Sequence, residues 1–166
     1  MTRRKRQQGG FTIVEMVITM CVIAVLAAVA IKEMREYTLR AKVSEVVLAS
    51  SNCKNTISEN FLFLDDAPAP GDWGCESKTG KSQYAGAVET SENGVIRVLV
   101  RSVDRRVDGR YIYVVPARGG TAMIAPDDLG TPVRSWICGS DWPLLRDSLP
   151  GNCRVDTTTY ASQDYD

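Results

Sequence analysis

The sequence predicts an α+β protein with one long N-terminal helix, a four-stranded antiparallel β-meander and a C-terminal disulfide loop. The first observation is an apolar run over residues 11–31 that contains a single charge, Glu15. The second is a run of apolar residues at three- and four-residue steps over 39–61, which is typical of an amphipathic helix. The third is a series of short β-branched runs over 94–138, separated by glycine-containing turns. The amphipathic half of the helix needs a surface to pack on, and the apolar face of the meander provides one.

The apolar run is long enough to cross a membrane. Residues 11–31 form about 21 residues of helix, or roughly 31 Å, against a hydrocarbon core of about 30 Å. The basic residues of segment 3–6 predict that the N-terminus stays cytoplasmic while the rest is exported. No small-residue cleavage site follows the run, so the natural cut lies before it, between Gly10 and Phe11. This cut frees an ammonium on Phe11, four residues from the Glu15 carboxylate.

Glu15 is the unusual residue of this segment, because a carboxylate in a bilayer costs roughly 2.5 kcal/mol or more. One interpretation is an interfacial glutamate that reaches water by snorkelling. The other is an ion pair with a Phe11 ammonium, that of a neighbouring subunit. A plain single-pass membrane anchor explains the segment but explains neither Gly10 nor Glu15.

The junction Gly10-Phe11-Thr12-Ile13-Val14-Glu15, with the basic leader before it and the alanine-rich run after it, resembles the class III signal of type IV pilins. The resemblance implies that residues 1–10 are a prepilin leader removed by a membrane peptidase. It also implies that the Phe11 amine is methylated and that Glu15 guides assembly. Many copies would then form a homo-oligomeric helical filament with the apolar helices as its core. An inner-membrane assembly platform would be a further partner.

The sequence departs from the family pattern at one point. Members of the family often have glycine in the membrane helix and a proline just after it. Here no glycine lies between Phe11 and Asp66, and Lys32 follows Ala30-Ile31. Both missing residue types weaken helices locally, so the melting known in some relatives is not implied for this helix.

Beyond the membrane segment, the helix is predicted to continue to residue 63 with one apolar face. Asp65 to Pro70 ends it, and residues 64–93 are expected to form an irregular connection with Trp73 and Tyr84 as anchors. Strands are expected at 94–103, 111–115, 121–124 and 133–138, with hairpin turns at 108–109 and 119–120. The predicted helical face contains Leu39, Val43, Val46, Val47, Ser50, Cys53, Ile57 and Phe61.

The cysteines predict two disulfides in the exported part. Four cysteines allow three connectivities, and the pairs Cys53–Cys75 and Cys138–Cys153 are favoured because each closes a modest loop. Zinc is the weaker alternative, since no C-x-x-C pair and no histidine occur. Cys21 lies in the apolar run and is interpreted as a small buried hydrophobic residue.

The C-terminal part carries a second resemblance. A tryptophan precedes Cys138, and a Leu-Pro pair precedes Cys153, as in the C-terminal region of type IVa pilins. The expected organisation is then a 138–153 disulfide-bounded loop and a 154–166 tail. The two resemblances lie at opposite ends of the chain, and residues 64–93 match no recognised family pattern.

The function implied is a structural subunit of a type IV pilus that supports adhesion, twitching motility or DNA uptake. It would reside in the inner membrane before assembly and in the extracellular pilus afterwards. Removing the leader leaves sixteen basic and twenty acidic residues, a net charge of −4, which does not favour DNA as a bulk electrostatic partner. With no histidine, phosphate loop or nucleophile motif, we expect no enzyme activity, no catalytic residue, no cofactor and no metal.

Two alternatives share the leader and Glu15. A DNA-binding minor pilin would use a local cluster of arginines, whose simpler interpretation is a solvated strand edge. A type II secretion pseudopilin commonly lacks the C-terminal cysteine loop, so Cys138 and Cys153 argue against it. The arginines of the cluster are Arg97, Arg101, Arg105, Arg106, Arg110 and Arg118.

Overall fold

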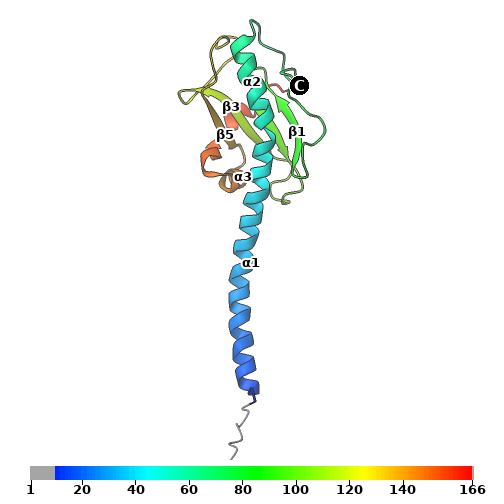
Figure 1. Ribbon diagram of the computed structural model, residues 1–166, viewed down its shortest axis with the longest axis vertical. Helices are drawn as coiled ribbons and strands as arrows, with labels where there is room; N and C mark the ends of the chain where they lie inside the picture. The colour runs from blue at the N-terminus through cyan, green and yellow to red at the C-terminus, as the bar shows by residue number, and fades with distance from the viewer. Residues whose placement is uncertain (1–9, 166) are drawn as a thin grey trace, which may run out of the picture. The chain divides into compact units, whose positions relative to one another are not determined.

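The computed structural model describes residues 10–165, so most of the expected leader lies outside the described residues. The chain divides into an N-terminal unit that ends at Tyr37 and a C-terminal unit that begins at Thr38 (Figure 1). Helix α1 (Ile13–Ala49) runs through this boundary, and α2 (Ser51–Phe63) follows it. The fold expected from the sequence, a long N-terminal helix with an antiparallel sheet and a C-terminal disulfide, is confirmed.

The helix differs from the expected single element at one residue. The turn at Ser50 separates α1 from α2, and both the backbone N–H and the hydroxyl of Ser50 donate to the Val47 carbonyl, at 3.2 and 2.7 Å. A serine that bonds back to the preceding turn competes with regular helical hydrogen bonding, which accounts for an interruption without glycine or proline. The helical segment ends at Phe63, as expected.

One face of the helical segment in the C-terminal unit is buried, as its periodicity predicts. Only Val47 of the predicted face remains half-buried. The others are 5% exposed or less: Leu39, Val43, Val46, Ser50, Cys53, Ile57 and Phe61. This face packs on strands of the sheet in one hydrophobic cluster, which makes it the core of the unit.

The sheet has six strands in the order β1-β2-β3-β5-β6, with β4 paired to β3. The four longer strands are antiparallel, whereas β6 runs parallel to β5. Their bounds are β1 (Ala85–Thr90), β2 (Ile96–Val100), β3 (Tyr111–Arg118), β4 (Thr121–Ala122), β5 (Ser135–Ser140) and β6 (Val155–Asp156).

Two strand predictions need correction. Strand β1 lies inside the segment 64–93 that was expected to be irregular, and the strand expected at 121–124 is only two residues long. The β1 sequence is rich in small residues with low β-propensity, so it carries no strand signal of its own. Gly86 allows a close approach there, because a Cβ at this position would lie 3.0 Å from the Leu99 side chain on β2. Packing against β2 therefore decides the conformation of β1.

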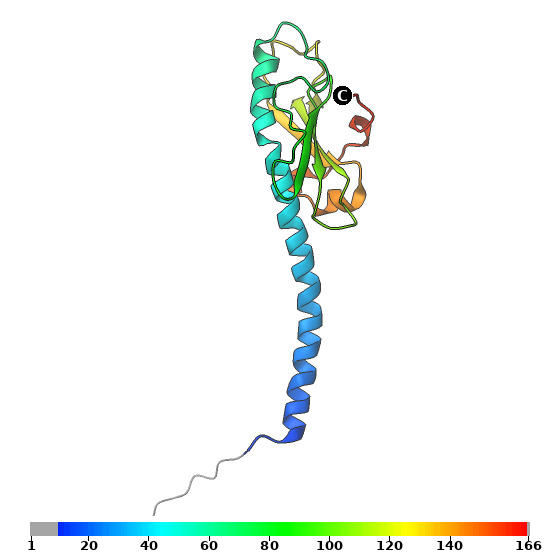
Figure 2. The same ribbon diagram turned by 90° about the vertical axis from the view of Figure 1, so that its right-hand side faces the viewer.

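The two faces of the sheet have different covers (Figure 2). Ile96, Val98 and Val114 face the helix, while Val115 and Tyr113 form a second cluster with Tyr165 of the C-terminal tail.

The disulfide-bounded loop is also more regular than expected. It contains α3 (Pro143–Ser148) and the short helix η1 (Gly151–Cys153), and η2 (Thr158–Tyr160) lies in the tail.

Candidate functional site

The N-terminal junction begins as an exposed, non-helical segment. Gly10, Phe11 and Thr12 precede α1, and Phe11 is 72% exposed. The backbone N–H of Glu15 donates to Thr12 Oγ1 at 3.3 Å, and the N–H of Met16 donates to the Thr12 carbonyl at 3.2 Å. Thr12 therefore caps the helix, and Glu15 occupies its first turn. The bond expected to be cut lies just outside this cap.

The N-terminal unit exposes an apolar surface along its helix. Among residues 10–165, one helical segment is long and apolar enough to cross a membrane, and its most apolar window is wholly uncovered. Exposed side chains include Ile13 at 84% and Leu26 at 65%. Cys21, expected to be buried, is also exposed in the isolated chain and carries no disulfide. A surface of this kind requires lipid or other apolar chains around it.

The other four cysteines form Cys53–Cys75 and Cys138–Cys153, the two pairs favoured from their spacing. The first joins α2 to the segment before β1, with Cα atoms 5.0 Å apart. The second joins β5 to η1 and closes the loop that contains α3. The first disulfide therefore fixes the irregular segment before β1 to α2, and the second fixes the two ends of the loop that contains α3.

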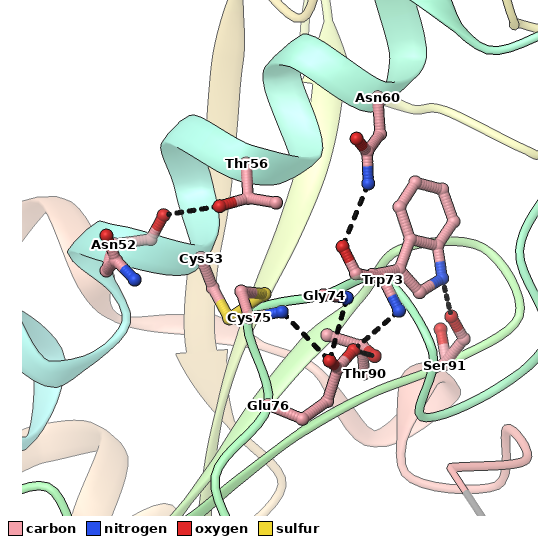
Figure 3. The surroundings of a disulfide bond; sticks show 10 residues. All are labelled: Asn52, Cys53, Thr56, Asn60, Trp73, Gly74, Cys75, Glu76, Thr90 and Ser91. Atoms are coloured by element: carbon pink, nitrogen blue, oxygen red, sulfur yellow. Dashed lines mark hydrogen bonds between the residues drawn. A yellow bond between two sulfur atoms is a disulfide. The ribbon is translucent and has the colours of Figure 1, made fainter.

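A carboxylate clamp beside Cys75 escaped the sequence analysis (Figure 3). Glu76 accepts hydrogen bonds from the backbone N–H groups of Trp73, Gly74 and Cys75, at 2.8 to 2.9 Å, and contacts the Thr90 hydroxyl. Burial alone would raise the pKa of the Glu76 carboxyl, but these hydrogen bonds outweigh burial and hold the pKa below its ordinary value. The one sequence feature that could have indicated this turn is Gly74. Its φ of 86° lets consecutive backbone N–H groups point toward one acceptor.

Trp73 connects the clamp to its surroundings. Its indole Nε1 donates to the Ser91 carbonyl at 2.8 Å, and its own carbonyl accepts from the Asn60 side chain at 2.9 Å. Its ring stacks on Phe61 at 5.4 Å between centroids. Trp73 thus serves as the anchor expected from the sequence, and it joins the loop to α2.

Most of the arginine cluster is engaged within the C-terminal unit. Arg97 pairs with Glu89 at 2.5 Å, and its guanidinium lies 4.0 Å from the Tyr165 ring centroid. Arg106 pairs with Asp104 at 2.9 Å. In addition, Arg101 donates to the Ser82 carbonyl and Arg110 stacks on Trp142. These contacts support the interpretation as a solvated strand edge rather than one phosphate-binding surface.

Two further observations concern titratable side chains. Among residues 10–165, no three histidine, cysteine, aspartate or glutamate side chains gather in a way that could hold a metal ion. Burial lowers the pKa of Lys54, whose ammonium lies 5.8 Å from the Trp136 ring centroid on the helix side of the sheet. Lys54 is therefore a half-buried residue that packs at the edge of the core.

Comparisons with known proteins agree with this arrangement. The family model of the pilins, described as bacterial filament proteins, matches residues 39–154. A model of the prokaryotic N-terminal methylation motif matches residues 5–31. An uncovered apolar helix with such a motif, followed by a disulfide-bonded sheet unit, defines a class of bacterial filament-forming proteins. The chain belongs to the pilin family, because the family model covers more than half of it. It is accordingly a structural subunit of a pilus.

Individual relatives of this chain are named as fimbrial or pilin proteins. A fimbrial protein of Neisseria meningitidis serogroup A is 34% identical over 93% of this chain and 86% of its own length. The type IV major pilin protein PilE of Neisseria gonorrhoeae is 28% identical over 91% of this chain and 84% of its own. The match to a crystal structure of a type IV pilin from Pseudomonas aeruginosa covers 70% of this chain and 98% of the pilin chain. Its TM-score is 0.46 and its sequence identity is 18%.

Proposed function

We propose that the chain is the precursor of a type IV pilus subunit that is processed at its N-terminal junction. A prepilin peptidase would cut between Gly10 and Phe11, and the new Phe11 amine would be methylated. The match of the N-terminal methylation motif over residues 5–31 supports this proposal. The exposure of Gly10 and Phe11 outside the capped helix also supports it, because a peptidase requires an extended, accessible bond.

Before assembly, residues 11–31 would cross the inner membrane once, with the N-terminus in the cytoplasm. The basic residues before the apolar run support this orientation. An inner-membrane assembly platform would then move subunits from the bilayer into an extracellular pilus. The two disulfides suit this route, since such bonds persist in exported compartments.

The observation that carries the proposal is the uncovered apolar surface of residues 11–31, in which Glu15 is the single charged residue. Lipid tails cover such a surface before assembly, and the same surface of other copies can cover it afterwards. Apolar packing alone leaves the register between parallel helices poorly defined. One charged group in each apolar run defines this register, because an unpaired charge in an apolar core is costly.

The partner of Glu15 would be the Phe11 ammonium of a neighbouring copy. Cleavage creates that ammonium, so the pairing is available only to processed subunits. A mature subunit that enters the filament core would then neutralise the carboxylate of its neighbour. Assembly and processing would thereby be linked by one ion pair.

The proposed role of the assembled filament is adhesion, twitching motility or DNA uptake, with no catalytic step in this chain. Direct DNA binding by the subunit is the less favoured alternative. The contacts of Arg97, Arg101, Arg106 and Arg110 within the C-terminal unit account for four of the six arginines of that cluster without nucleic acid.

The deciding experiment compares Glu15→Ala with the wild-type chain as the only pilin in the cell. Membrane insertion and cleavage at Gly10 should be unchanged, whereas sheared filaments should fall about tenfold or more, because the Phe11 ammonium then lacks a counter-charge. Immunoblots of the cell-bound and sheared fractions, intact mass of the membrane form and electron microscopy give the three readouts.

Glu33→Ala is the matched control, because Glu33 is exposed on the same helix but lies beyond the apolar run. It should assemble like the wild type. A plain membrane anchor predicts no assembly defect for either variant, and a snorkelling glutamate predicts a mild one for Glu15→Ala. Normal filament numbers from the Glu15→Ala strain would therefore reject the role proposed for this residue.

A further inference from the structure

We propose that Glu76 is a positioning residue that specifies the Cys53–Cys75 disulfide by shaping the segment around Cys75 before the bond forms. The inference is independent of the filament role, because it concerns how the C-terminal unit acquires its covalent structure. It rests on the carboxylate clamp, on the anchors of Trp73, and on the position of Cys53 on α2.

The clamp organises Cys75 without help from the disulfide. One carboxylate gathers the N–H groups of three consecutive residues, and the last of these belongs to Cys75 itself. Hydrogen bonds to an ionised acceptor are about twice as strong as neutral ones. Gly74 adopts the positive φ that this turn needs. The turn of residues 73–76 is therefore encoded locally, within four residues of sequence.

The turn is also attached to the helix that carries the partner thiol. Asn60 bonds the Trp73 carbonyl, and Phe61 stacks on the Trp73 ring. Cys53 lies seven residues before Asn60, which is about two helical turns on the same face. From Trp73 to Cys75 the chain runs back along α2 toward Cys53, where the two Cα atoms come within 5.0 Å (Figure 3).

A third attachment holds the turn on the sheet. Thr90 at the end of β1 contacts the Glu76 carboxylate, and Ser91 accepts from the Trp73 indole. Ser77 forms a pair of backbone hydrogen bonds with Val88, each of 2.9 Å. The segment is thus held from the helix side and from the sheet side, and Cys75 is left facing α2.

Such positioning matters because all four paired cysteines belong to one hydrophobic cluster. A collapsed but unfinished core can then offer Cys75 a wrong partner in Cys138 or Cys153. Loop entropy alone discriminates weakly between the possible pairings, since it grows only slowly with loop length. A preformed turn raises the effective concentration of Cys75 toward Cys53 alone.

The chemical step is an ordinary thiol–disulfide exchange. The thiolate of one cysteine attacks a disulfide oxidant of the exported compartment, and the second thiolate then displaces that oxidant from the mixed disulfide. Two thiols lose two protons and two electrons, and the oxidant leaves as a dithiol. Glu76 takes no part in this exchange and acts only on the position of Cys75.

The test is oxidative refolding of the mature chain in detergent, in a Cys21→Ser background, with a glutathione redox buffer. Disulfide-linked peptides are quantified by mass spectrometry during the reaction. The wild type should form mainly Cys53–Cys75 and Cys138–Cys153. In Glu76→Gln the ratio of Cys53–Cys75 to mispaired Cys75 should fall about tenfold, because the amide places donors against the backbone N–H groups.

Glu59→Gln is the matched control, since Glu59 is exposed on α2 and lies outside the clamp. It should pair its cysteines as the wild type does. If Glu76→Gln also pairs like the wild type, the proposal is rejected, even if that variant is less stable once folded.

A second measurement covers the outcome in which Glu76→Gln fails to complete folding. In a chain with Cys138→Ser and Cys153→Ser, the glutathione ratio that half-oxidises Cys53 and Cys75 reports their effective concentration directly. Adding Glu76→Gln should lower that effective concentration about tenfold. An unchanged value would show that the clamp does not position Cys75.

Discussion

The backbone N–H of Glu15 donates to the hydroxyl of Thr12 across 3.3 Å, so the residue that caps the helix also orients the single acidic residue of the apolar run. The spacing Thr12-x-x-Glu15 is that of a capping box. A carboxylate in the first helical turn is further stabilised by the positive end of the helix dipole. Glu15 at this position therefore stabilises the first turn of the helix, and its carboxylate remains available to a partner at the N-terminal end.

The first prediction concerns Thr12. Thr12→Ala should cost the first turn of α1 about 1 kcal/mol, because an N-cap acceptor is lost. Helical secondary chemical shifts of residues 13–16 in detergent micelles should decrease, and sheared filaments should decrease less than in Glu15→Ala. Thr12→Ser keeps the hydroxyl and should behave like the wild type in both measurements. Equal shifts in all three proteins would show that the cap does not hold this turn.

The second prediction concerns processing at Gly10. Filament protein should have an intact mass that lacks residues 1–10, with one methyl group added at Phe11. Gly10→Ser should leave the precursor uncut, because the peptidase site must admit a residue with almost no side chain. A mature chain that begins at another residue would contradict the assignment of this junction. Gly9→Ser is the control, since it changes the neighbouring glycine outside the proposed bond.

The elements that the sequence predicted are those with a strong period. The face from Leu39 to Phe61 repeats at helical spacing over several turns, so its burial follows from pattern alone. Strand β2 alternates between buried Ile96 or Val98 and half-exposed Arg97, which is the period of a strand with one core face. Such patterns are reliable because the periodic apolar residues are the ones that pack in the core of the fold.

The elements that escaped prediction depend on contacts distant in sequence. Strand β1 pairs with β2, and its Gly86 lies close against the Leu99 side chain of that strand. Strand β6 pairs with β5 because Gly139 leaves room for the Val155 backbone. The turn at Glu76 is local, but its attachment to Thr90, fourteen residues away, is not, and the sequence around Glu76 resembles an ordinary polar loop. None of these features has a period, so only the fold brings the partners together.

The third prediction concerns the disulfides. Peptide mapping under non-reducing conditions should show Cys53–Cys75 and Cys138–Cys153, with Cys21 as a free thiol. Cys138→Ser should destabilise the C-terminal unit by about 3 kcal/mol, because a loop near fifteen residues is no longer closed in the unfolded chain. Filament yield should fall as a result. Cys21→Ser is the control and should change neither stability nor the map.

The last prediction concerns acid. Hydrogen bonds hold the pKa of Glu76 below its ordinary value of 4.5, so the folded chain binds the Glu76 proton more weakly than the unfolded chain does. A depressed folded pKa contributes stability that is fully present above 4.5 and is lost as the pH falls through the folded value. The midpoint of urea unfolding should therefore decrease below about pH 4.5.

Glu76→Gln removes this titration and isolates its share of the acid response. At pH 7 the variant should be less stable by about 1 kcal/mol, a value discounted for the partial exposure of the carboxyl. Its urea midpoint should fall less steeply than that of the wild type between pH 5 and about pH 3, so the two curves converge in acid. The other carboxyls with lowered pKa, those of Asp104 and Asp156, are present in both proteins and cancel in the difference. If the two curves stay parallel over this range, the charge of the Glu76 carboxylate contributes nothing to stability.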